Sequence, residues 1–309
     1  MIYTITLNPS VDYIVQLDNL KTGLVNTVDQ ETKIAGGKGV NVTRVLKRLG
    51  HQSTALGFVG GFTGQFIEKS LNDEELSTKF IHVEGDTRIN IKLKNSEETE
   101  INGLSPSISE DYVDKLFEQL SQTVPGDLVV MAGSVPASIN QSIYSRILHS
   151  LPDGVQAIVD TKGKALEETL KAKPFLVKPN HHELGDLFGV TVTTVDDAVK
   201  YGKKVQAMGA ENVIVSMAGN GAVLITQEDI LFGNVPVGHV KNSVGAGDSV
   251  VAGFLSTYIE TGDLKEAFQS GIAAGSASAF SSGFCTEEEV QTLRKKISVK
   301  PYDNGGGQR

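Results

Sequence analysis

Short apolar runs alternate with amphipathic segments along most of the chain. Seven runs rich in Val, Ile, Leu and Ala have the length and composition of buried β-strands. They are Ile2–Leu7, Thr54–Val59, Leu128–Ala132, Ala157–Asp160, Phe175–Lys178, Val213–Met217 and Ala222–Thr226. Helical spacing of apolar residues predicts helices over Tyr112–Leu120 and over Val40–Leu49, the latter ended by Gly50 at the C′ position. The alternation predicts an α/β fold with a mainly parallel sheet flanked by helices on both faces, which binds ligands at the carboxyl ends of its strands.

Two segments interrupt this alternation. In residues 11–34 and 87–103, polar and apolar residues alternate with little helical character. A period of two is typical of strands with one solvated face, so we expect a few antiparallel strands outside the main sheet, forming a small β lid. The large domain would then comprise residues 1–10, 35–86 and 104–309.

Composition and charge limit the classes of binding partner and the cellular compartment that we expect. The chain has 309 residues, of which 39% are hydrophobic and 21% charged, as in globular proteins with a sizeable core. A net charge of −9 argues against nucleic acid or an anionic membrane as the main partner. No signal-peptide pattern and no run of about 18 apolar residues occurs. Because Cys285 is the only cysteine, which fits a reducing compartment, we expect a cytoplasmic protein.

An acidic residue stands between a glycine-rich turn and a strongly apolar helix in the sequence NSVGAGDSVVAGFLSTYI, residues 242–259. Gly245 and Gly247 allow a tight turn, and the apolar residues after them recur with helical spacing. Free N–H groups at a helix start attract anions. Asp248 therefore either caps this helix or acts on a group bound at the turn.

A second glycine-rich segment, AGGKGVN, opens the helix predicted at Val40. Its glycines let the backbone approach a ligand closely, and Lys38 adds a positive charge; the alternative is a plain turn with a solvated lysine. The P-loop motif, the dinucleotide motif G-x-G-x-x-G after the first strand, and zinc motifs are all missing. A dinucleotide-dependent oxidoreductase is therefore a weak rival interpretation.

Several motifs together resemble a known family. In chain order they are TLNPSVD, GGKGVN, VGGFTGQF, DTRINIKL, GSVP, KPNHHEL and SVGAGDS. Their order and spacing resemble the ribokinase-like sugar kinases of the PfkB family, and the first, second and fourth resemble its sugar-phosphate branch. The resemblance implies transfer of the γ-phosphoryl group of Mg-ATP to a primary hydroxyl of a ketohexose phosphate. D-Fructose 1-phosphate is the first expectation, D-tagatose 6-phosphate the alternative, and a non-catalytic nucleotide or sugar-phosphate sensor a remoter one.

The resemblance also implies a catalytic centre and an acceptor site. Asp248 matches the family's catalytic base, and the amides of Gly245, Ala246 and Gly247 match an anion hole for the transferring phosphoryl group. The acceptor-side matches are Asp12, Gly37 and Asn41 for the sugar hydroxyls, Lys38 and Arg88 for the phosphate on the sugar, and Ser134 for a further contact. Arg88 could instead lie on a solvated strand face.

On the nucleotide side, the resemblance implies contacts from the second half of the chain. Matching positions are Lys178, Asn180 and Glu183 in the N-x-x-E element, and Ser216, Gly219 and Gly221 in a turn after a strand. Glu183 and Asp160 would hold Mg²⁺, Glu183 through water. The alternative for Asp160 is a strand-end aspartate that caps a turn.

Three departures from the family pattern stand out. Ala218 occupies a position that is usually glycine. Lys162 and Lys164 follow Asp160 where relatives often carry small polar and acidic residues; we expect Lys162, or less favourably Lys164, to contact a phosphate, the alternative being a solvated loop lysine. Some relatives place a second arginine where this chain reads Glu100-Ile101-Asn102. The resemblance further implies a homodimer formed through the lid.

Overall fold

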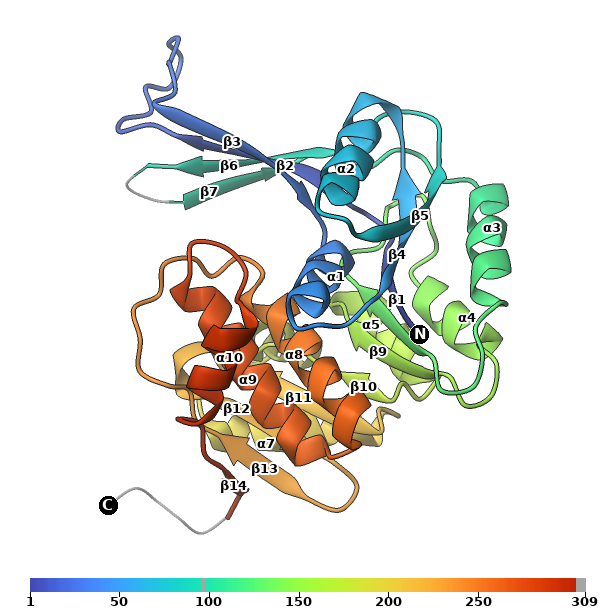
Figure 1. Cartoon of the computed structure of the whole chain (residues 1–309), viewed down its shortest axis with the longest axis vertical. Helices are drawn as coiled ribbons and strands as arrows, with labels where there is room; N and C mark the ends of the chain where they lie inside the picture. The colour runs from blue at the N-terminus through green and yellow to red at the C-terminus, as the bar shows by residue number, and fades with distance from the viewer. Residues whose placement is uncertain (96–97, 304–309) are drawn as a thin grey trace.

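The structure is a computed structural model that describes residues 1–95 and 98–303. Residues 96 and 97, inside the predicted lid segment, lie outside the described residues. Strands and helices alternate along most of the chain and build one large and one small sheet (Figure 1). The α/β class predicted from the alternation of apolar runs is therefore confirmed.

The large sheet has ten strands. In spatial order they are β14 (Val299–Pro301), β13 (Ile230–Gly233), β12 (Ala222–Ile225), β11 (Asn212–Ser216), β10 (Leu176–Val177), β9 (Gln156–Asp160), β8 (Leu128–Ala132), β1 (Ile2–Thr6), β4 (Thr54–Val59) and β5 (Ser77–His82). Pairing is parallel from β11 to β5. The strands β12 to β14 add an antiparallel edge. The sheet is mainly parallel, as predicted.

All seven predicted strands are present, with ends that differ by at most one residue. The apolar pattern did not predict β5, β13 and β14. The signal is weak in two of them, because β5 buries only Phe80 and Ile81, and β14 is a three-residue edge strand that contains Pro301. The strand β13 is apolar but only four residues long.

Helices cover both faces of the large sheet (Figure 1). They are α1 (Lys38–Arg48), α2 (Gly61–Asp73), α3 (Glu110–Leu120), α4 (Ile143–Ser150), α5 (Gly163–Leu170), α6 (His181–Phe188), α7 (Val195–Ala207), α8 (Ala246–Thr261), α9 (Leu264–Phe280) and α10 (Glu287–Arg294). One core cluster joins α3 to α7 to the sheet, and another joins α1, α8, α9 and α10 to its opposite face. Gly50 follows α1 with φ 85°, which confirms it as the C′ residue. No helix of the described ranges is long and apolar enough to cross a bilayer.

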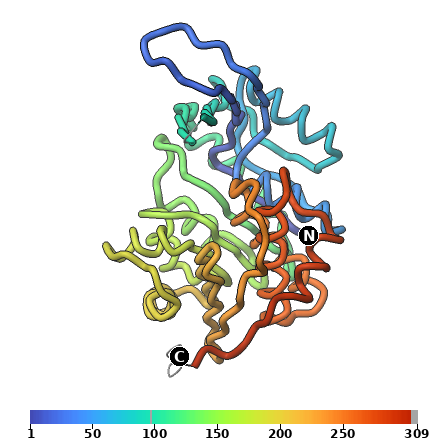
Figure 2. The backbone as a smooth tube through the Cα atoms, turned by 90° about the vertical axis from the view of Figure 1, so that its left-hand side faces the viewer, coloured from blue at the N-terminus to red at the C-terminus, as the bar shows by residue number. Residues whose placement is uncertain are grey.

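The small sheet lies at one end of the molecule (Figure 1). Its order is β3 (Gln30–Gly36), β2 (Ser10–Gln16), β6 (Ile89–Lys94) and β7 (Glu98–Asn102). The segment between β2 and β3 projects beyond the rest of the chain (Figure 2). Pairs β2–β3 and β6–β7 are antiparallel, as predicted, but the central pair β2–β6 is parallel. The physical reason is that β2 and β6 follow β1 and β5, which run parallel in the large sheet and leave it in the same direction.

Candidate active site

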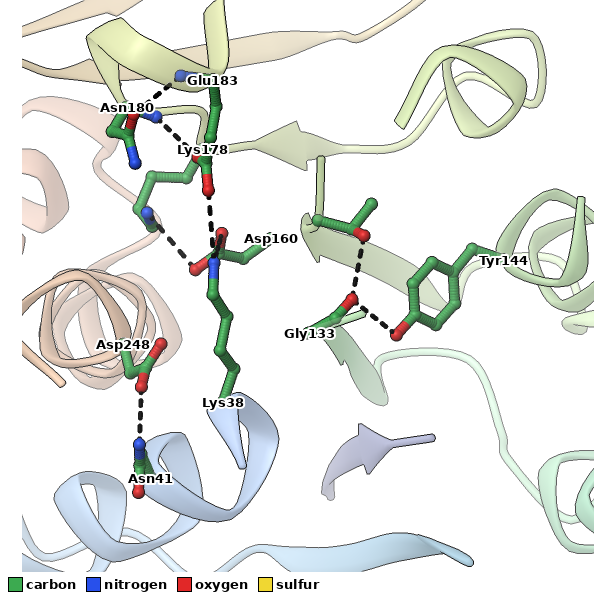
Figure 3. A network of polar contacts seen from close by, with 10 residues as sticks. Lys38, Asn41, Gly133, Tyr144, Asp160, Lys178, Asn180, Glu183 and Asp248 are labelled. Atoms are coloured by element: carbon green, nitrogen blue, oxygen red, sulfur yellow. Dashed lines mark hydrogen bonds and ion pairs between the residues drawn. The ribbon is translucent and has the colours of Figure 1, made fainter. Parts of the chain in front are cut away.

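The predicted site residues gather where the parallel strands end. Asp160 is the last residue of β9 and Ser216 the last of β11, while Gly133 follows β8 directly and Lys178 follows β10. The helices α1 and α8 begin close to these strand ends and bring Lys38, Asn41 and Asp248 toward them (Figure 3). The carboxyl edge of the sheet thus carries this group of titratable side chains, where an α/β fold places its ligands.

The start of α1 is held against β1 by an unusually close approach. A Cβ atom on Gly39 would lie 2.5 Å from Oγ1 of Thr6 and 2.8 Å from the carbonyl oxygen of Ile5, so only glycine fits there. The amide of Val40 donates a hydrogen bond of 3.0 Å to Oγ1 of Thr6, which satisfies an N–H group of the first turn. The sequence GGKG therefore fixes the direction in which Lys38 and Asn41 leave the helix.

Gly245 is the N-cap residue of α8 and has a left-handed conformation, with φ 78°. The first helical hydrogen bond runs from the amide of Ser249 to the carbonyl of Gly245, so the preceding N–H groups have no acceptor within the helix. The amide of Ala246 has a contact of 3.3 Å with the carbonyl of Ser243, which ties it to the turn. The amides of Gly247 and Asp248 complete the first turn, and the amide of Asp248 was not among the predicted donors.

Asp248 is buried in the first turn of α8, and its Oδ2 accepts a hydrogen bond of 2.8 Å from Nδ2 of Asn41 (Figure 3). Burial, followed by the charge of Asp160, raises the pKa of Asp248 to about 6. Lys38, Asn41 and Lys178 oppose this rise. A carboxylate with a pKa near 6 is ionised at pH 7 and accepts a proton more readily than an exposed aspartate.

Two lysines hold the neighbouring carboxylate Asp160 (Figure 3). Nζ of Lys38 lies 2.9 Å from Oδ1, and Nζ of Lys178 lies 3.3 Å from Oδ2. Burial alone would raise the pKa of Asp160, but the two ammonium groups outweigh it and lower the pKa. Nζ of Lys38 also lies 3.7 Å from Oε1 of Glu183. The predicted metal residues Asp160 and Glu183 are thus brought together around one ammonium group, that of Lys38.

The N-x-x-E element forms a capping box at the start of α6. The amide of Glu183 donates to Oδ1 of Asn180 at 2.8 Å, and the amide of Asn180 donates to Oε2 of Glu183 at 2.9 Å. Only Oε1 of Glu183 is left to face Lys38. Asn180 therefore orients Glu183, a structural role that differs from the nucleotide contact expected of it.

Among the residues predicted to bind the acceptor, Asp12 of β2 is surrounded by donors. Its Oδ1 accepts hydrogen bonds from Oγ of Ser10 at 2.7 Å and from Nδ2 of Asn90 at 3.1 Å. Its Oδ2 lies 3.3 Å from Nζ of Lys92. A Cβ atom on Gly36 would lie 2.8 Å from the same carboxylate, so the first glycine of GGKG allows this approach.

Arg88 and Ser134 both contact the segment that follows β1. The guanidinium of Arg88 donates to the carbonyl of Asn8 at 3.1 Å and makes a longer contact of 3.4 Å with that of Pro9. Oγ of Ser134 accepts a hydrogen bond of 3.1 Å from Nδ2 of Asn8. Arg88 is half-buried, so it does not lie on a fully solvated strand face.

The predicted nucleotide turn follows β11. The amide of Met217 donates to the carbonyl of Gly221, and Gly221 has φ 99°. Ala218 has a positive φ of 48°, which explains why glycine suits this position better. Gly219 faces open space. Lys162 is the exposed N-cap residue of α5, two residues after Asp160.

Three polar residues that contact the predicted acceptor residues were not predicted from the sequence. Asn8 bridges Ser134 and Ser105, while Asn90 and Lys92 contact Asp12. A signal was present for the last two, because Arg88, Asn90 and Lys92 recur with the period of two that places side chains on one face of a strand.

Residues 5–290 match the family described as pfkB family carbohydrate kinase. The chain belongs to this family. It is thus a kinase that transfers a phosphoryl group to a sugar hydroxyl, on the ribokinase-like α/β fold that the motifs predicted. The pfkB motifs GGKG and GAGD are the turns that open α1 and α8.

Individual relatives within this family indicate which sugar kinases the chain is similar to. The 1-phosphofructokinase of Bacillus subtilis (strain 168) is 52% identical over 300 residues, covering 97% of this chain and 99% of the relative. A tagatose-6-phosphate kinase of Staphylococcus epidermidis (strain ATCC 35984) is 35% identical over 97% of the chain and 99% of the relative. Among solved structures, phosphofructokinase-2 from Escherichia coli in complex with fructose-6-phosphate superposes with a TM-score of 0.88 at 28% identity, covering 96% of this chain and 98% of that one.

Proposed function

We propose that this pfkB kinase transfers the γ-phosphoryl group of ATP to the 6-hydroxyl of D-fructose 1-phosphate and forms fructose 1,6-bisphosphate. The observation that carries the proposal is the buried Asp248, which stands in the first turn of α8 beside amides without a helical acceptor. The choice of acceptor is supported by the 52% identity to a 1-phosphofructokinase over nearly the whole chain.

In the proposed reaction, Asp248 takes the proton of the acceptor hydroxyl as the oxygen attacks the γ-phosphorus. Its raised pKa supports this role, since a base with a pKa near 6 is ionised at pH 7 and still binds a proton usefully. Asn41 orients the carboxylate through the hydrogen bond to Oδ2. The amides of Gly247 and Asp248, with those of Gly245 and Ala246, would stabilise the charge on the transferring group.

The nucleotide would lie along the carboxyl ends of β9 to β11. We infer contacts with ATP from Ser216, Gly219 and Gly221 in the turn after β11, and from Lys162 at the start of α5. Lys178 is buried beside Gly247, because a Cβ on that glycine would lie 3.4 Å from Nζ of Lys178. Its positive charge would therefore help the turn at Gly247 to bind an anion, and it also pairs with the carboxylate of Asp160.

The chemistry of the donor set suits Mg²⁺. Asp160 and Glu183 offer carboxylate oxygens, the ligands that a hard cation prefers. In residues 1–95 and 98–303 no three His, Cys, Asp or Glu side chains group as a metal site, so the protein would supply few ligands and the phosphates and water the others, as is usual for Mg²⁺. When bound, the ion would neutralise charge on the phosphates. Lys38 and the ion would then both contact the carboxylates of Asp160 and Glu183.

On the acceptor side, we infer that Asp12, Gly37 and Asn41 hold sugar hydroxyls, with Ser134 as a further contact. Arg88 and Lys38 are the proposed partners of the sugar's own phosphate. The small sheet would act as a lid that excludes water from the site and limits hydrolysis of ATP. We further propose that two copies pair through this lid.

A coupled assay tests the proposal by comparing kcat/KM for D-fructose 1-phosphate with that for D-tagatose 6-phosphate. We expect D-fructose 1-phosphate to be the better acceptor by more than tenfold. The reverse order would favour the alternative function, that of a tagatose-6-phosphate kinase. The 35% identity to such an enzyme supports this alternative. Tight binding of both sugars without turnover would instead indicate a sensor.

A further inference from the structure

Lys92 is a lysine with little access to solvent. It lies on β6, its side chain is 10% exposed, and its Nζ is 3.3 Å from Oδ2 of Asp12. A second carboxylate, Glu100 of β7, lies 3.7 Å from the same Nζ and is 49% exposed. The strand register explains this contact, because Lys92 is the direct cross-strand partner of Glu100. Lys92 is thus a buried cation between one enclosed carboxylate and one that reaches solvent.

A buried ammonium group is costly unless its neighbours compensate its charge. Packing alone would be served by an apolar residue at this position, as the neighbouring Leu93 shows on the other face of the strand. The groups facing the acceptor side here include Asp12, Glu100 and Asn90, together with Arg88, whose pKa is lowered by burial against the opposing effect of Asp12. Asp12 and Glu100 compensate the charge of Lys92, but the contact with Glu100 is the longer one and its carboxylate is half-exposed, so another anion can take the place of Glu100 beside the ammonium group.

A series of contacts leads from the catalytic carboxylate to Lys92. Asp248 bonds to Asn41, whose amide bonds to the carbonyl of Gly37. The adjacent Gly36 packs against Asp12, and Asp12 pairs with Lys92. An acceptor with its reacting hydroxyl at Asp248 and a ring hydroxyl at Asp12 would direct its other end toward Lys92. In a ketohexose phosphate, the existing phosphate is at that other end.

We propose that Lys92 is a specificity-determining residue that binds the phosphate already carried by the acceptor. The inference rests on the proposed function. Of the two cations expected there, Lys38 is paired with Asp160 and Glu183, and Arg88 is bonded to backbone carbonyls. Lys92 supplies a further charge on the same face of the small sheet, directly across from Glu100. The incoming phosphate displaces Glu100, whose half-exposed side chain is free to turn outward.

The test compares a phosphorylated with an unphosphorylated sugar. For Lys92→Met we expect the KM for D-fructose 1-phosphate to rise roughly 10- to 100-fold. The inhibition constant of D-fructose, measured as a competitor, would change less than about threefold. Lys92→Arg would recover most of the loss. Lys94→Met, which removes a lysine from the same face of the same strand two residues further on, is the matched control and should leave both constants unchanged.

Equal weakening of both sugars in Lys92→Met would contradict the proposal, because it would mean that Lys92 only positions Asp12. No change in either constant would contradict it as well. Should Lys92→Met fail to fold, Glu100→Gln decides. Removing the competing carboxylate is expected to lower the KM for D-fructose 1-phosphate about two- to fivefold, and no decrease would overturn the proposal. Failure of the proposed function would show separately, as a wild-type enzyme that does not phosphorylate D-fructose 1-phosphate.

Discussion

The ionisation of Asp248 gives a prediction at the scale of single residues. Its pKa of about 6 arises from burial and from Asp160. Because the base acts only when ionised, kcat/KM should be constant above about pH 7 and fall tenfold per pH unit below about pH 6. Lys38 lowers this pKa, so Lys38→Met should shift the acidic limb to higher pH. A profile measured from pH 5 to 9 that stays flat, or shifts the other way in Lys38→Met, would contradict this role.

Lys162 gives a second prediction at this scale. It is exposed at the start of α5, and the amide ends of helices attract phosphate. If Lys162 contacts a phosphate of ATP or product, Lys162→Ala should lower kcat by more than about twofold. Lys164→Ala, on the same helix, is the comparison. A change smaller than about twofold in Lys162→Ala would identify it as a solvated loop lysine.

Single residues also show how far the sequence predicts the site. Asp248, Asn41 and Lys38 could be predicted because each lies in or next to a glycine-rich motif, and the packing of α1 beside α8 brings them together. The partners of Asp12 were not predicted. Ser10 is adjacent in sequence, but Asn90 and Lys92 come from a strand about 80 residues away, and no local pattern indicates which strand pairs with β2.

At the scale of elements, the packing of α8 on α9 positions the glycine turn that precedes Asp248. Gly253 makes the approach possible, because a Cβ there would lie 2.5 Å from Cβ of Ala274 and 2.7 Å from the carbonyl of Ser270. Gly253→Ala should therefore destabilise the protein by roughly 1–3 kcal/mol, although alanine is the better helix former. Urea denaturation measures this. Gly283→Ala, where nothing lies within 4 Å, is the control, and equal stability of the two variants would contradict the packing argument.

The elements themselves were predicted best where burial is strongest. The strands β4 and β8 were predicted over their full lengths because every one of their residues is buried. Edge strands carry a weaker signal, and β5 and β14 were missed. The parallel pairing of β2 and β6 was missed for a different reason: it depends on the direction in which β1 and β5 leave the large sheet, which is a property of the whole topology.

At the scale of the whole molecule, the proposed pairing of two copies can be tested on the small sheet. Ile89 and Ile101 are 40% and 57% exposed on the face of the small sheet opposite Asp12. Exposed apolar residues on a sheet face are typical of an interface. Ile101→Asp should therefore convert a dimer into a monomer in analytical ultracentrifugation, while Val124→Asp, at a similarly exposed residue between α3 and β8, should not. A wild-type monomer, or an unchanged dimer in Ile101→Asp, would contradict pairing through this face.

The central claim is that one carboxylate removes the proton at the point where backbone amides receive the phosphoryl group. The most direct test is a single-turnover measurement of Asp248→Asn with ATP, Mg²⁺ and D-fructose 1-phosphate, together with the dissociation constants of both substrates. We predict that the rate of phosphoryl transfer falls about 10²- to 10⁴-fold, while both dissociation constants stay within about threefold of wild type. A transfer rate within about threefold of wild type would contradict the account.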